Sequence, residues 1–162
     1  MRRGPLSVAG LAVLALGCAA PGGDFPRPVQ GSLETVLPGD GRPALIVFFS
    51  TGCQVCFEDL LEMVGFVRRK GLDFPVVGVC GDPGAEIEAF VEKYSVRVPI
   101  VRDGRGRIRR RFKIGLLPFK IVLSAGQEVY RDDDLLPLAE RSRRVQRCLV
   151  GLMAGSPPGS RF

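Results

Sequence analysis

Hydrophobic residues follow two patterns along this chain, short continuous runs and helical repeats, and the two patterns alternate. The clearest continuous run covers residues 43–50. An apolar run of this length is typical of a central β-strand that is buried on both faces. The segment 53–70 then repeats apolar side chains at helical spacing, with Leu60, Leu61, Val64 and Val67 on one face. Gly71 ends this predicted helix.

The alternation continues to the end of the chain. Further strands are predicted at 74–80, 98–101, 119–123 and 128–131, with a short edge strand at 32–37. Further helices are predicted at 84–94 and 135–153, with a helical turn at 108–112. Strands that alternate with helices, followed by a late hairpin and a closing helix, predict an α/β fold with a mixed central sheet flanked by helices.

The N-terminal segment has the features of an export signal. Arg2 and Arg3 precede a short apolar stretch at 6–16, which is too short to span a bilayer comfortably. Ala15-Leu16-Gly17-Cys18 resembles a bacterial lipobox, so residues 1–17 are expected to be a lipoprotein signal peptide with lipidation at Cys18. The alternative is ordinary cleavage after Ala20, which the following proline disfavours.

Either cleavage predicts an extracytoplasmic protein, in a compartment where disulfides persist. The lipoprotein interpretation adds a lipid anchor that tethers the protein to a membrane, facing the periplasm. Residues 18–31 are then the lipid anchor and a flexible tether rich in proline and glycine, 32–153 are the folded domain, and 154–162 are a disordered tail.

The amino-acid composition excludes several classes of catalytic and binding site. The chain has 162 residues, a formal net charge of +6 and no histidine, which excludes Ser-His-Asp and Cys-His catalysis and His-ligated metal sites. The densest basic run, at 105–111, lacks the interleaved aromatic residues expected of a nucleic-acid surface. We therefore expect no nucleic-acid partner and interpret the charge as solvated helix faces, with an acidic protein partner as the alternative.

Cys53-Gln54-Val55-Cys56 lies where the predicted central strand gives way to the first helix. At a helix N-terminus the first sulfur is favoured as a thiolate, and the second, one turn inward, can resolve a mixed disulfide. Half of a zinc site and an inert structural disulfide are the alternatives. Zinc would need further nitrogen or sulfur ligands, and the chain has no second CxxC. We expect no metal and no cofactor other than a redox-active Cys53–Cys56 disulfide.

The motifs together resemble the thioredoxin fold, and within it the TlpA-like extracytoplasmic thiol–disulfide oxidoreductases, over about residues 32–153. The resemblance rests on the strand-CxxC-helix unit, on Gly115-Leu116-Leu117-Pro118, on the strand and turn at 119–129, and on an insertion at 82–94. The chain departs from the patterns of these proteins at four positions. Gly52 replaces the family's usual tryptophan, and Leu117 its usual threonine or valine. Val47 stands where thioredoxin itself has a buried aspartate, and Asp59 where the extracytoplasmic relatives often have a glutamate.

The resemblance implies roles for residues near the cysteines. Pro118 would be a cis-proline opposite the pair, and Leu117 with Pro118 would bind a substrate segment as an added strand. Glu58 and Asp59 would be candidates for a proton relay, with helix-dipole charges at a solvated surface as the alternative. Outside the motif, Cys80 is expected to be a small core residue and Cys148 structural or free, with a bridge between them as the alternative.

The leading functional hypothesis is a membrane-tethered thiol–disulfide oxidoreductase that reduces or exchanges disulfides of exported proteins, with cytochrome c maturation as one use. Its partners would be protein disulfides or thiols and a membrane thiol reductase as electron donor. A thiol peroxidase is one alternative, although Ile46 and Ser50 stand where peroxiredoxins have proline and threonine. The other is a redox-inactive binding module with a static Cys53–Cys56 bridge.

Overall fold

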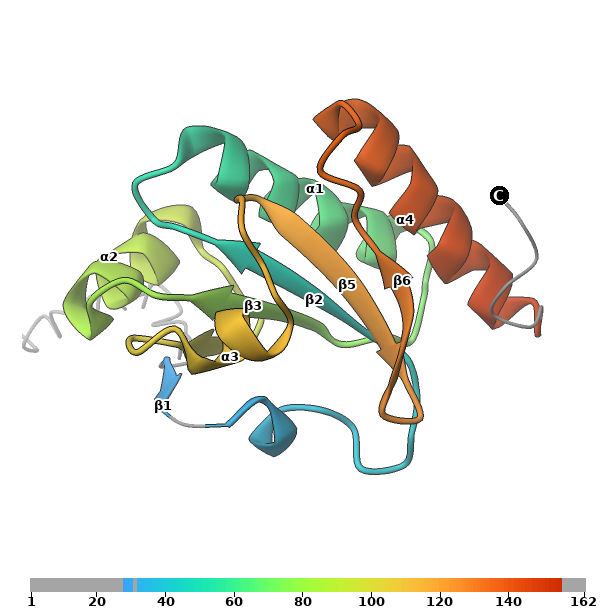
Figure 1. Cartoon of the computed structure of the whole chain (residues 1–162), viewed down its shortest axis with the longest axis horizontal. Helices are drawn as coiled ribbons and strands as arrows, with labels where there is room; N and C mark the ends of the chain where they lie inside the picture. Colours follow the sequence, from blue (N-terminus) through green and yellow to red (C-terminus); the bar gives the residue numbers. More distant parts are fainter. Residues whose placement is uncertain (1–27, 31, 156–162) are drawn as a thin grey trace, which may run out of the picture.

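A computed structural model of the chain describes residues 28–30 and 32–155 and contains one six-stranded sheet (Figure 1). Its strands lie in the order β1-β4-β3-β2-β5-β6. Their bounds are β1 Val29–Gln30, β2 Ala44–Phe49, β3 Val76–Cys80, β4 Ile100–Arg102, β5 Phe119–Ser124 and β6 Gln127–Arg131. The first four strands in that order run parallel, and β5 and β6 pair antiparallel. The predicted mixed sheet is therefore confirmed.

The helices cover both faces of this sheet unequally. Their bounds are α1 Gln54–Arg69, α2 Gly84–Tyr94, α3 Arg107–Arg111 and α4 Leu138–Met153, with a 3₁₀ helix, η1, at Leu33–Thr35. Helices α1, α2 and α4 contribute buried side chains to one hydrophobic cluster, and α3 and η1 contribute to the other. Figure 1 shows α1 and α4 side by side on their common face.

Strand β2 explains why the sheet needs helices on both faces. Alternate side chains point to opposite faces of a strand, so Val47 packs toward α1 and Ile46 toward α3. All six residues of β2 are buried. Burial of a large apolar side chain contributes roughly 1.5–3 kcal/mol, and this strand therefore supplies much of the core.

Two predicted elements differ from the structure in type or by more than two residues. The segment 32–37 is not a strand, because Ser32 caps η1 by accepting a hydrogen bond from the Glu34 backbone N–H at 3.2 Å. A serine at this position favours a helical start over an extended backbone. Val29–Gln30 instead pairs with β4 at the edge of the sheet. The last helix begins at Leu138 and not at 135, because Pro137 occupies its N-cap and disfavours a helical residue before it.

Part of the predicted domain organisation lies outside the described residues. The expected signal peptide at 1–17, the lipidation site Cys18, most of the tether at 18–31 and most of the tail at 154–162 belong to segments that the structure does not describe. Among the described residues, no helix is both long enough and apolar enough to cross a bilayer.

Gly78 is a position where the centre of the sheet tolerates no side chain. It is buried in β3 between β2 and β4, and an added Cβ would lie 2.9 Å from Cε1 of Phe49 and 3.2 Å from Cγ1 of Ile100. We expect Gly78→Ala to lower the free energy of unfolding by about 1–3 kcal/mol in urea denaturation. Gly39→Ala is the control, because no atom lies within 4 Å of its added Cβ. Equal stability of both variants would refute this close packing.

Candidate active site

The two cysteines of the CxxC motif are joined by a disulfide at the start of α1. Their Cα atoms are 5.2 Å apart. Cys53 is the N-cap of the helix and is partly exposed, whereas Cys56 is fully buried one turn inward. The Cys53 sulfur also accepts a hydrogen bond from the Cys56 backbone N–H at 3.2 Å. Backbone N–H groups and the helix dipole at this end favour a thiolate on the first cysteine once the disulfide is reduced.

A single carboxylate holds the loop that leads from β2 to Cys53. Oδ2 of Asp82 accepts hydrogen bonds from the Thr51 backbone N–H at 2.6 Å, the Thr51 hydroxyl at 2.8 Å and the Ser50 hydroxyl at 3.0 Å. It also accepts one from the Cys80 thiol at 3.3 Å. Burial raises the pKa of Asp82, but these hydrogen bonds outweigh burial and lower it overall.

Asp82 was not singled out in the sequence. The available signal was its place just after a strand that runs parallel to β2. The carboxyl ends of parallel strands meet at one edge of a sheet, so Asp82 reaches the loop that carries the cysteines.

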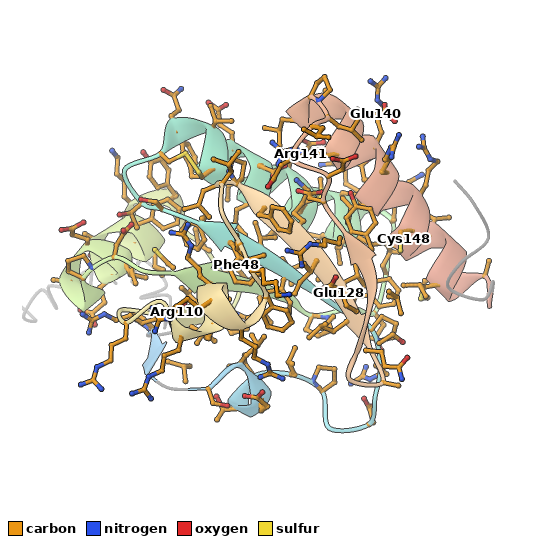
Figure 2. All side chains as sticks on the ribbon, in the orientation of Figure 1. Phe48, Arg110, Glu128, Glu140, Arg141 and Cys148 are labelled. Carbon is orange, nitrogen blue, oxygen red and sulfur yellow. A yellow bond between two sulfur atoms is a disulfide. The ribbon has the colours of Figure 1, made fainter. Side chains whose placement is uncertain are left out.

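The remaining two described cysteines are free thiols, so the Cys80–Cys148 bridge considered as an alternative is absent. Cys80 is fully buried, and burial raises its pKa to about 12, with the nearby Asp82 carboxylate adding to the effect. Burial also raises the pKa of Cys148 on α4 (Figure 2). Both therefore stay protonated and are poor nucleophiles near neutral pH.

The Gly115-Leu116-Leu117-Pro118 loop lies at the same edge of the sheet as the disulfide. Phe119, the first residue of β5, pairs with Phe48 near the end of β2, so Pro118 adjoins the segment that leads to Cys53. The Leu117–Pro118 peptide bond is cis, as the resemblance implied. Leu117 packs against both hydrophobic clusters, while Leu116 is 61% exposed.

The two acidic residues after the CxxC motif have different surroundings. Glu58 is exposed and accepts a hydrogen bond from Nε2 of Gln54 at 2.9 Å, as expected of a solvated helix charge. Asp59 is only 2% exposed, so the interpretation as a solvated surface charge is wrong for this residue. Asp59 is the third residue after Cys56 along α1, which places it one helical turn away on the same face.

A fully buried lysine balances the charge of the Asp59 carboxylate. Nζ of Lys120 donates to both Asp59 oxygens, at 3.0 and 2.8 Å, and lies 3.2 Å from Oδ2 of Asp132. The Ser142 hydroxyl from α4 donates to Oδ1 of Asp59 at 3.0 Å. Burial raises the pKa of Asp132, and the Lys120 charge opposes that effect. Lys120, Asp59 and Asp132 are called the buried ion cluster below.

The buried ion cluster was missed by the sequence analysis. Its signal was Lys120, a charged residue in the otherwise apolar strand that follows Pro118. In the sheet register Lys120 lies directly opposite Val47, the position where thioredoxin has a buried aspartate. The chain thus provides a buried carboxylate from helix α1 and not from the central strand.

The described residues offer no group of three or more Cys, Asp and Glu side chains that could hold a metal ion. The chemistry that the site can supply from its own atoms is two-electron exchange between a dithiol and a disulfide.

Comparison with known proteins agrees with this geometry. The model of the AhpC/TSA family matches residues 25–130. A thiol-disulfide oxidoreductase ResA from Geobacillus kaustophilus is 25% identical over 120 residues, which are 72% of this chain and 67% of that protein. The ResA of Geobacillus thermodenitrificans is 24% identical over the same shares.

Solved structures share the fold. StoA from Bacillus subtilis superposes with a TM-score of 0.54 at 18% identity, covering 66% of this chain and 81% of StoA. A secreted disulfide oxidoreductase of Mycobacterium tuberculosis gives a TM-score of 0.56 at 15% identity, covering 73% and 85%. The expected thioredoxin-like fold and the expected likeness to thiol–disulfide oxidoreductases are confirmed. Because the family model covers most of the folded domain, this chain belongs to the AhpC/TSA family.

Proposed function

We propose that this protein is an extracytoplasmic, membrane-tethered thiol–disulfide oxidoreductase that reduces or exchanges disulfides of exported proteins. The observation that carries the proposal is the asymmetric disulfide at the N-terminus of α1, with Cys53 accessible and Cys56 buried. The ResA relatives, which are named for this activity, support it.

The first step uses Cys53 as the nucleophile. In the reduced protein its thiolate attacks one sulfur of a client disulfide, and the client S–S bond breaks as the new bond to Cys53 forms. The departing client sulfur leaves as a thiolate and takes a proton from solvent. A mixed disulfide between the protein and its client results.

The second step uses Cys56 as the resolving thiol. Cys56 loses its proton, attacks the Cys53 sulfur and releases the second client thiolate, so two electrons pass to the client and the Cys53–Cys56 disulfide forms. Asp59 is the proposed proton acceptor, because it lies one turn from Cys56 inside the protein. The hydrogen bonds from Lys120 and Ser142 hold its carboxylate in place.

The cycle needs an external reductant of the dithiol class. A membrane thiol reductase would transfer two electrons to the Cys53–Cys56 disulfide and become oxidised itself. One use for the reduced protein is the delivery of reduced cysteines to cytochrome c maturation.

Client binding is assigned to the loop around Pro118. An extended client segment would pair with the backbone at Leu117 and Pro118 as an added strand. Leu116 adds an exposed apolar side chain beside this backbone.

The cysteine assignment is tested with single variants. We expect the parent protein to catalyse insulin reduction by dithiothreitol and Cys53→Ser to lose this activity, because the accessible nucleophile is gone. Cys56→Ser should accumulate mixed disulfides with clients, since the resolving thiol is missing. The measurements are insulin turbidity and non-reducing gel electrophoresis.

Three outcomes would contradict this assignment. Trapping by Cys53→Ser instead of Cys56→Ser would reverse the two roles. Rapid peroxide consumption without insulin reduction would favour a thiol peroxidase. A reduction potential below about −300 mV, with no exchange, would indicate a static bridge.

The role of Asp59 is tested against its exposed neighbour. We expect Asp59→Asn to slow resolution of the mixed disulfide by at least about tenfold near pH 7, because Cys56 loses its internal proton acceptor. The rate should recover as the pH rises, when hydroxide replaces the carboxylate. Glu58→Gln, its matched control, should resolve at the parent rate. An unchanged rate for a folded Asp59→Asn protein, checked by circular dichroism, would remove Asp59 from the mechanism.

The proposed lipid anchor makes a separate prediction. We expect Cys18→Ala to move the protein from the membrane fraction to the soluble extracytoplasmic fraction, because the anchored sulfur is lost. Cell fractionation and immunoblotting measure this, with Cys148→Ala as the control that stays on the membrane. An unmodified mature N-terminus at Pro21 in mass spectrometry would contradict lipidation.

A further inference from the structure

Two arginine side chains hold the two ends of the loop that carries Pro118. Nη2 of Arg109, from α3, donates to the Gly115 carbonyl at 3.1 Å. Nη1 of Arg141, from α4, donates to the Pro118 carbonyl at 3.0 Å. Because α3 and α4 lie on opposite faces of the sheet, the loop is fixed from both sides. Figure 2 shows Arg141 close to the start of β5.

Arg141 is built into the protein more firmly than an ordinary surface arginine. Its side chain is only 12% exposed, and Nη1 lies 3.7 Å from Oδ2 of Asp132 and 3.9 Å from Oδ1 of Asp134. The Tyr130 hydroxyl, which has a single proton to donate, lies 3.0 Å from the Arg141 carbonyl and 2.8 Å from Oδ1 of Asp132. The two carboxylates offset the guanidinium charge, and the hydrogen bond from Nη1 to the Pro118 carbonyl directs the side chain toward the loop.

The contacts connect Arg141 to the buried ion cluster through Asp132. Asp132 accepts from the Lys120 backbone N–H at 3.0 Å, and Lys120 lies two residues after Pro118. A planar guanidinium can interact with a carboxylate and donate a hydrogen bond to a carbonyl at the same time. A lysine ammonium makes such contacts with less control over their direction. The position of the Pro118 carbonyl is therefore set by the same residues that fix the start of β5.

We propose that Arg141 is a positioning residue for polypeptide clients: it fixes the Pro118 carbonyl so that the backbone at Leu117 is presented as a ready strand edge. The inference rests on the proposed oxidoreductase function and adds a substrate class, extended polypeptide disulfides, which need this edge. A small disulfide that forms no strand with Leu117 would react with Cys53 without help from Arg141.

The test compares two disulfides in single-turnover reactions of the reduced, full-length protein. One is a disulfide-bonded extended peptide, and the other is the small neutral bis(2-hydroxyethyl) disulfide. Acid quenching and thiol alkylation measure how fast Cys53 and Cys56 are oxidised at increasing concentrations of each disulfide. The variants are Arg141→Gln, which loses the charge, and Arg141→Lys, which keeps it without the planar fork.

For both variants we expect the half-saturating peptide concentration to rise about tenfold, as for loss of a charge-assisted hydrogen bond. The rate with the small disulfide should stay within about twofold of the parent rate, because Cys53 itself is untouched. Arg144→Gln is the matched control on the same helix, since Arg144 pairs with Glu140 and not with the loop. It should change neither rate.

Equal slowing with both disulfides, or no change with either, would overturn the positioning role of Arg141. If Arg141→Gln and Arg141→Lys melt below the assay temperature, Arg109→Gln replaces them, because it releases the other end of the same loop. An unchanged peptide preference in that variant would also overturn the proposal. A parent protein that reduces neither disulfide would instead refute the proposed oxidoreductase function, and the inference with it.

Discussion

The buried ion cluster is the interaction on which the arrangement of this site depends. Lys120 is completely buried, and its charge is tolerated only because Asp59 and Asp132 lie within hydrogen-bond distance. Removing one partner of such a group typically costs about 3–5 kcal/mol, so the three side chains must stay together. They come from α1, from β5 and from the segment after β6. One cation thus fixes the helix that starts at the disulfide against the strand that starts after Pro118.

The buried ion cluster also helps to position the backbone around the disulfide. Asp59 attaches α1 to β5 through its ion pair with Lys120. Asp82, which follows the neighbouring parallel strand β3, accepts hydrogen bonds from the loop before Cys53. Neither carboxylate contributes atoms to the disulfide. The backbone around the sulfurs is therefore fixed by groups that are not consumed in exchange, which is the preorganisation that a thiol-exchange site requires. The site differs in this respect from a bare CxxC at a helix end, where the helix dipole alone would favour the thiolate.

The differences between prediction and structure have local and distant causes. The errors at 32–37 and 135–137 are local: the Ser32 cap and Pro137 were visible in the sequence and outweighed the apolar pattern around them. The burial of Asp59 has a distant cause. Helix position alone is equally compatible with a solvated charge and a buried one. The choice depends on Lys120, which is 61 residues further along the chain.

The sequence by itself determined the fold class, the alternation of strands and helices and the CxxC pair, because these depend on patterns within a few residues. The continuous apolar run of β2, the CxxC at the start of α1 and the proline before β5 are local signals, and each is found where it was predicted. Only the tertiary structure decided which charges are buried and which side chains hold the Pro118 loop. Ion pairs and hydrogen bonds such as those of Lys120 and Arg141 join residues from separate elements. Their geometry exists only after the helices have packed on the sheet, so no periodicity in the chain encodes it.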